Sequence, residues 1–132
     1  MHLTFQELRE ANEVRLAMFK NAKGEPAHAK ADGSDWSEND WMVAVTGEVG
    51  ELANKLKKLR RGDFDLTNVQ SRTSVMEEVG DIIVYMDLLA KRLGMTLEEC
   101  VTYTFNRVSK KQGLSVFLVD WGSIRDEGKE RS

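Results

Sequence analysis

The same five-residue pattern occurs twice in this chain, 30 positions apart: Glu48-Val49-Gly50-Glu51-Leu52 and Glu78-Val79-Gly80-Asp81-Ile82. Each copy places two carboxylates three residues apart, which puts both on one face of a helix. Like charges this close repel each other and are costly to bury without compensation. Oxygen ligands suit a hard divalent cation, so the four acids are candidate ligands of Mg²⁺, or of Mn²⁺ in its place.

The glycines of the two copies strengthen this interpretation. Gly50 and Gly80 fall inside helices, where glycine costs about 1 kcal/mol relative to alanine. Their equivalent positions predict that another backbone or a ligand approaches closely at both places. The alternative is a chance repeat on two solvated acidic faces, and the shared register of the two copies favours a site.

Basic and aromatic residues accompany the acids. Lys55 and Lys58 continue the acid stripe toward a helix C-terminus, where they either complement the helix dipole or bind a phosphate. Tyr85 follows Asp81 by one turn on the same face, which favours a ligand contact. Trp41 is a core aromatic by default, with a substrate contact as the alternative.

Bulk composition excludes several function classes. A net charge of −3 and a pI near 5.5 argue against a nucleic-acid-binding surface, which would be basic. No apolar run approaches the roughly 18 residues of a membrane span, and the start lacks the pattern of a signal peptide. We therefore expect a globular protein of the cytoplasm. His2 and His28 lie outside the predicted helices and are expected to be plain surface residues.

Helical periodicity and capping patterns predict an all-α fold of four helices. The predicted segments run from Thr4 to about Lys20, from Ser37 to Gly62, from between Thr67 and Ser74 to Gly94, and from Thr96 to Gly113. A long polar loop, Asn21–Ser37, separates the first two, and a short tail, Leu114–Trp121, follows the last. The expected unit is a four-helix bundle with a C-terminal tail, completed by oligomerisation.

The two middle helices each carry an apolar stripe with the acids at its margin. The stripes are Val45, Val49, Leu52, Leu56 and Leu59 in one helix, and Val75, Val79, Ile82, Met86, Leu89 and Leu93 in the other. Two antiparallel helices packed by these stripes would bring all four acids around one pocket.

The ligand types narrow the metal chemistry. Bundles that hold iron with carboxylates use Glu-x-x-His on two helices, and no predicted helix here carries a histidine. Magnesium with few protein ligands usually works together with substrate phosphates. The chain lacks a Walker-type glycine loop, so phosphate transfer or hydrolysis without a P-loop is the expected chemistry.

The order Glu48-x-x-Glu51, then Glu78-x-x-Asp81, resembles the all-α nucleoside triphosphate pyrophosphohydrolases of the MazG-like superfamily. The segments from Gly47 and Glu77 resemble its metal-site helices, and Phe105-Asn106-Arg107-Val108-Ser109-Lys110-Lys111 resembles its last-helix motif. This resemblance covers about residues 36–113. It implies a single domain that hydrolyses a (deoxy)nucleoside triphosphate to the monophosphate and pyrophosphate.

The resemblance also implies roles for individual residues. The four acids would hold Mg²⁺, Tyr85 would pack on the sugar, Asn106 would hydrogen-bond the sugar or base, and Lys110 would contact phosphate. Homodimers or homotetramers are implied as well. Some members carry an extra glutamate where this chain has Gly47, so we assign the acceptance of the proton from water to Glu48 or Glu51. The competing hypothesis is a non-catalytic, metal-stabilised helical module that binds nucleotides or a protein partner.

Overall fold

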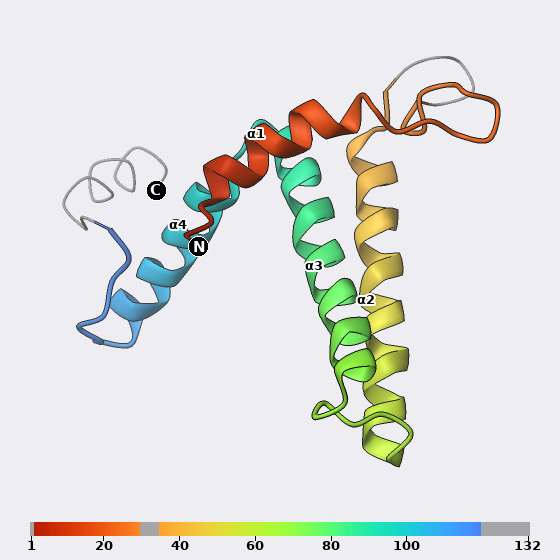
Figure 1. Cartoon of the computed structure of the whole chain (residues 1–132). Coiled ribbons are helices and arrows are strands. Elements are labelled where there is room, and N and C mark those ends of the chain that lie inside the picture. The colour runs from red at the N-terminus through yellow and green to blue at the C-terminus, as the bar shows by residue number, and fades with distance from the viewer. Residues whose placement is uncertain (1, 30–34, 120–132) are drawn as a thin grey trace.

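Four α-helices and their connections make up the computed structural model, which describes residues 2–29 and 35–119 (Figure 1). The helices are α1 (Phe5–Leu16), α2 (Glu38–Arg61), α3 (Val69–Arg92) and α4 (Leu97–Lys111). The described residues contain no strand, only isolated bridges between Lys20 and Pro26 and between Ala29 and Asp35. The all-α prediction is therefore confirmed. None of the described helices has the length and apolar character needed to cross a bilayer.

The helix ends follow the capping residues of the sequence. Ser37 accepts from the backbone N–H of Asp40, whose side chain accepts in return from Ser37, and this closes a capping box at the start of α2. Thr4 and Glu7 do the same for α1. Gly62 ends α2 in the left-handed conformation, with φ of 86°, which glycine adopts without steric cost.

The first helix is shorter than predicted, because it ends at Leu16 rather than near Lys20. The side chain of Asn21 accepts hydrogen bonds from the backbone N–H groups of Lys23 and Glu25. Together with Gly24, at a φ of 77°, these bonds form a turn. The residues between Leu16 and this turn are therefore not part of the helix. The described part of the predicted tail, residues 114–119, contains no strand. The last residue of the predicted tail, Trp121, lies outside the described residues.

The helices α2 and α3 form a long antiparallel hairpin, and α1 lies across its end (Figure 1). Burial is concentrated where the three helices meet. Trp41, Leu88 and Leu89 form the buried centre there, with Leu16, Trp36, Tyr85 and Met86 packed against it. The fourth helix diverges from α3 and runs away from the hairpin in Figure 1.

The predicted apolar stripes of α2 and α3 are sheltered over part of their length and exposed over the rest. Val49, Leu56 and Val79 leave 47%, 46% and 47% of their surface exposed. Val45, Leu52 and Leu59 of the same stripe on α2 are sheltered, and so are Glu48 and Lys55 beside it. Glu48 and Glu78 are thus sheltered between the helices, whereas Glu51 and Asp81 are exposed, and part of the stripe faces outward.

The expectation that another backbone approaches Gly50 and Gly80 closely is wrong within one chain, and the alternative of a ligand there stays a prediction. A Cβ atom added at either position would meet nothing within 4 Å. Both glycines adjoin the exposed valines of the stripe, Val49 and Val79, so they belong to the same outward face of the hairpin.

A buried polar network fixes α1 against α3. Arg9 donates from Nε to both carboxylate oxygens of Asp87, at 3.0 and 3.1 Å, and from a terminal nitrogen to the backbone oxygen of Met95 at 2.8 Å. Asn12 donates to Asp87 Oδ2 at 3.0 Å. Asp87 is only 1% exposed, so its charge is stable there because these donors satisfy it.

Candidate metal centre

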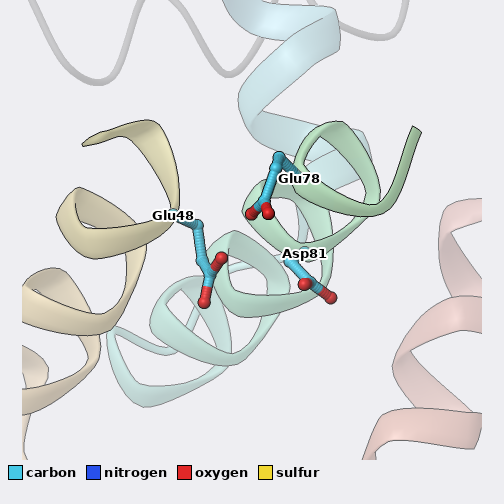
Figure 2. A group of neighbouring side chains, drawn as sticks. All are labelled: Glu48, Glu78 and Asp81. Atoms are coloured by element: carbon cyan, nitrogen blue, oxygen red, sulfur yellow. The ribbon is translucent and has the colours of Figure 1, made fainter. Parts of the chain in front are cut away.

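Three of the four predicted metal ligands converge between α2 and α3. Glu48 from α2 and Glu78 and Asp81 from α3 each offer a carboxylate oxygen, and these oxygens all lie within 4.8 Å of one another. Figure 2 shows Glu48 and Glu78 directed toward each other across the space between the two helices, with Asp81 close by on α3. Glu78 is buried, Glu48 is half-buried and Asp81 is exposed, so the group opens to solvent on one side.

The fourth predicted ligand, Glu51, lies outside this group, and its side chain is exposed. The sheltered residues of α2 include Val45, Glu48, Leu52 and Lys55, which follow one another at steps of three or four residues. Glu51 lies one residue before Leu52 and therefore falls beside this line. The repeated sequence pattern gave no sign that the two acid pairs would differ in this way.

Lys55 occupies the fourth side of the group instead. Its ammonium donates to Oε1 of Glu78 and, at 2.9 Å, to the backbone oxygen of Ser74 on α3. The cluster thus contains a cation supplied by the chain itself. Lys58, one turn further along, is exposed, and its Nζ lies 5.3 Å from the ring centroid of Phe64.

The surroundings of Glu48 and Glu78 shift the pKa values of these two carboxyl groups in opposite directions. The pKa of Glu48 is raised, first by burial, then by its hydrogen bond with Glu78 and by the negative charges of the neighbouring acids. The pKa of Glu78 is lowered, mainly by the hydrogen bond from Lys55. The same bond raises the pKa of Lys55 and keeps it charged. Glu78 is therefore held ionised, and Glu48 takes up a proton more readily than Glu78 does.

A cavity of about 320 Å³ adjoins the acids and shares Asp81 with them. Tyr85, on the same face of α3, also lines it, and burial is the main cause of the raised pKa of its phenol. The other walls come from α1, the loop after it and α3. They comprise Asn12, Arg15, Leu16, Phe19, Ala27, His28, Val84 and Leu88. Tyr85 and Asp81 thus line the same cavity, and a ligand contact by Tyr85 stays a prediction.

The expectation that His28 is a plain surface residue is wrong. Its ring stacks on Trp41 at 5.2 Å and makes edge contacts with Trp36 at 4.9 Å and Phe19 at 5.5 Å. Burial lowers its pKa, and its Nδ1 atom is buried with no hydrogen-bond partner among the described residues. The only sequence signal was the concentration of aromatic residues around this loop. His2, by contrast, is exposed as expected.

Trp41 belongs to the core, in agreement with the default interpretation. It is 5% exposed and contacts Trp36 at 4.8 Å and Tyr85 at 6.1 Å between ring centroids. A second cavity, of about 520 Å³, borders Trp41, Trp36 and His28 and continues toward Lys91 and Arg92. His28 lines both cavities. Of the two, only the smaller one is lined by an acid of the metal centre, Asp81.

The predicted substrate contacts on α4 do not join the site within one chain. Asn106 is fully buried, and its amide is engaged by the backbone of Leu118, which accepts at 2.9 Å and donates at 2.7 Å. The amide thus attaches the C-terminal tail to α4. Lys110 is exposed in the last turn of α4, the part of this helix that lies farthest from the hairpin in Figure 1.

Comparisons with known proteins leave the family of the chain open. No protein-family model matches it, and no solved structure matches it. The gene 37 protein of Mycobacterium phage L5 is 28% identical over 89 residues, which cover 67% of this chain and 72% of that protein. Its name states no activity.

Proposed function

We propose that the protein is a nucleoside triphosphate pyrophosphohydrolase of the MazG-like kind. It would hydrolyse a (deoxy)nucleoside triphosphate to the monophosphate and pyrophosphate with Mg²⁺, or with Mn²⁺ in its place. The observation that carries the proposal is the convergence of Glu48, Glu78 and Asp81 from two helices, in the chain order on which the resemblance rests.

The donor set fits a hard divalent cation. All three converging side chains offer only oxygen, and two rigid helices hold them. The ammonium of Lys55 already lies against Glu78, so the cluster accommodates positive charge. Glu51 is the proposed fourth ligand, and its exposed side chain is not held by packing. When bound, the cation would neutralise triphosphate charge and lower the pKa of a water molecule.

Within the chain, Glu48 is the best-suited proton acceptor. In the metal-free chain its pKa is raised, chiefly by burial, which makes it a stronger proton acceptor than Glu78. Glu78 is held ionised by Lys55 and serves as a fixed ligand rather than as a base. The alternative acceptor, Glu51, lies beside the group, and we therefore assign the role to Glu48.

The smaller cavity is the proposed nucleoside site. A volume of about 320 Å³ falls at the lower end of the range for small-molecule pockets, and Asp81 joins it to the acids. The ring of Tyr85 would pack on the sugar and disfavour a 2′-hydroxyl, which makes a deoxynucleotide the preferred substrate. A nucleoside here would have its phosphates at the carboxylates.

We also propose a homodimer or homotetramer. The outward face of the hairpin carries large exposed apolar side chains on both helices: Met42, Val49, Leu56, Met76, Val79 and Ile83. Burial of this face in a symmetric contact would remove it from water. A phosphate contact by Lys110 would then come from a neighbouring copy. Size-exclusion chromatography with light scattering tests this point, and a monomer at micromolar concentration contradicts it.

A panel of common NTPs and dNTPs, each with Mg²⁺ and with Mn²⁺, tests the activity. Products are separated so that pyrophosphate is distinguished from orthophosphate. Pyrophosphate from one preferred nucleotide is the expected result. Absence of hydrolysis across the panel, with folded protein that binds the metal, would favour the non-catalytic module instead.

A substitution in the acid cluster separates the two classes. Asp81→Asn should abolish hydrolysis while circular dichroism shows the helices intact, because the change removes charge from an exposed ligand. The matched control is Glu77→Gln on the same helix, an exposed acid outside the group, which should retain hydrolysis. Unfolding of the Asp81 variant, with no activity in the wild type, would indicate a purely structural cluster.

A further inference from the structure

Lys55 is the one cation that the described structure holds against the carboxylate cluster. Its side chain is only 17% exposed and that of Glu78 11% exposed, so the pair is largely sheltered from water. Lys57 and Lys58, on the same helix, are exposed. We propose that Lys55 is a built-in counter-cation that competes with the divalent cation for Glu78, so that the nucleotide-free protein binds the metal weakly. This inference rests on the proposed function.

The competition follows from the sharing of one carboxylate. Lys55 donates to Oε1 of Glu78, and Glu78 is also one of the three converging ligands. A divalent cation at this group would have the ammonium as its neighbour. Repulsion between neighbouring positive charges at a partly solvated site changes a binding constant by about tenfold or more. Loss of the lysine charge should therefore tighten metal binding.

Nucleotide binding would relieve this repulsion. A triphosphate adds several negative charges beside the acids, and these attract the ammonium of Lys55 as well as the metal. Metal and nucleotide would thus bind with positive coupling, which by linkage acts equally in both directions. The function of Lys55 would be to reserve tight metal binding for the protein that also holds its substrate.

A purely structural role for Lys55 predicts a different result. The bond from Nζ to the backbone oxygen of Ser74, at 2.9 Å, also ties α2 to α3. A structural clamp would lower the melting temperature when removed, and it would leave metal affinity unchanged or weaker. Metal affinity in the absence of nucleotide therefore separates the two roles, and it does so without any measurement of hydrolysis.

The experiment is a titration of chelator-treated protein with Mn²⁺, followed by electron paramagnetic resonance of the free ion. Lys55→Met removes the charge and keeps most of the side-chain length, and we expect about tenfold tighter Mn²⁺ binding than in the wild type. Lys57→Met, with the same change in net charge on the exposed face, should stay within about threefold. Lys55→Arg, which keeps the charge, should also stay close to the wild type.

Circular dichroism and thermal melts accompany each variant. If Lys55→Met does not fold, Lys55→Gln takes its place, because its amide still donates a hydrogen bond without a charge. Unchanged or weaker Mn²⁺ binding in the folded, uncharged variant overturns the proposal, as does equal tightening in Lys57→Met. Tighter binding without hydrolysis in any variant would refute the proposed enzyme and leave the counter-cation standing. Absence of Mn²⁺ binding in all variants would refute both.

Discussion

Replacement of Glu48 by glutamine should stabilise the metal-free protein while it removes the proposed activity. Glu48→Gln preserves the shape of the side chain and deletes one negative charge from the group that it forms with Glu78 and Asp81. Carboxylates this close repel one another when ionised, and the raised pKa of Glu48 reflects that repulsion after the larger effect of burial.

The size of the effect follows from the separation of the charges. Two unit charges at the 4.8 Å limit of the group repel by about 3–4 kcal/mol at an effective dielectric constant near 20. Lys55 offsets part of this, and water at the exposed Asp81 screens more, so about 1 kcal/mol should remain. For a chain of this length the melting temperature should rise by roughly 4 °C.

The direction of the pKa shift of Glu48 determines how the stability gain of Glu48→Gln changes with pH. A carboxyl group whose folded pKa is raised is protonated in the folded chain at pH values where the unfolded chain is already ionised. The destabilisation by Glu48 is therefore absent below its ordinary value of 4.5 and grows as pH rises through the raised folded pKa. The advantage of Glu48→Gln should be full at pH 8 and should vanish near pH 4.

Differential scanning calorimetry of chelator-treated protein at these two pH values measures the effect. Glu51→Gln is the matched control, because it deletes the same charge from the same helix at an exposed position, and its shift should be smaller. Added Mg²⁺ should raise the melting temperature of the wild type and leave that of Glu48→Gln unchanged. A variant less stable than the wild type at pH 8, or a gain that persists at pH 4, would refute this reasoning.

Three further predictions concern the supports of the site and its pH profile. Asp87→Asn should lower the free energy of unfolding by about 3 kcal/mol, measured by urea denaturation, because it leaves the guanidinium of Arg9 without its charged partner; a loss under 1 kcal/mol would contradict the structure. Asn106→Ala should cost about 1–3 kcal/mol and increase proteolysis after residue 113, because Leu118 loses both of its bonds to α4; unchanged protection of the tail would exclude this anchoring role. Initial-rate measurements with saturating Mg²⁺ should show hydrolysis lost as the pH is lowered, because the carboxylates hold the cation and accept a proton only when deprotonated; a rate that rises toward acid pH would argue against these roles.

Much of the fold was readable from the sequence because its signals are local. Capping by Ser37 and Asp40 and the left-handed Gly62 involve residues three or fewer positions apart or a single backbone angle. Such signals act before any tertiary contact forms, and the predicted boundaries of α2 agree with the structure. The end of α1 was the exception, because the turn around Asn21 and Gly24 competed with helix propagation.

The candidate site was readable only in part. The spacing of Glu48, Glu78 and Asp81 sufficed to nominate them, since helical periodicity fixes which face each one occupies. Periodicity fixes the sheltered face of α2 only approximately. Val45 and Leu52 are sheltered as predicted, but Glu48 and Lys55 are sheltered as well, whereas Val49 and Leu56 are exposed. Glu51 was predicted to be a metal ligand for the same reason. It matches Asp81 in the repeated sequence pattern, but the two residues do not hold equivalent positions in the structure.

Only the tertiary structure assigned roles to Lys55, His28 and Asn106. Each depends on atoms far away in the sequence: Glu78 for Lys55, the rings of Trp36 and Trp41 for His28, and the backbone of Leu118 for Asn106. The sequence by itself determined which residues can be ligands and that helices carry them, because residue type and local periodicity are properties of short segments. The partner of each buried polar group was decided by packing, because burial and charge pairing depend on which surfaces meet.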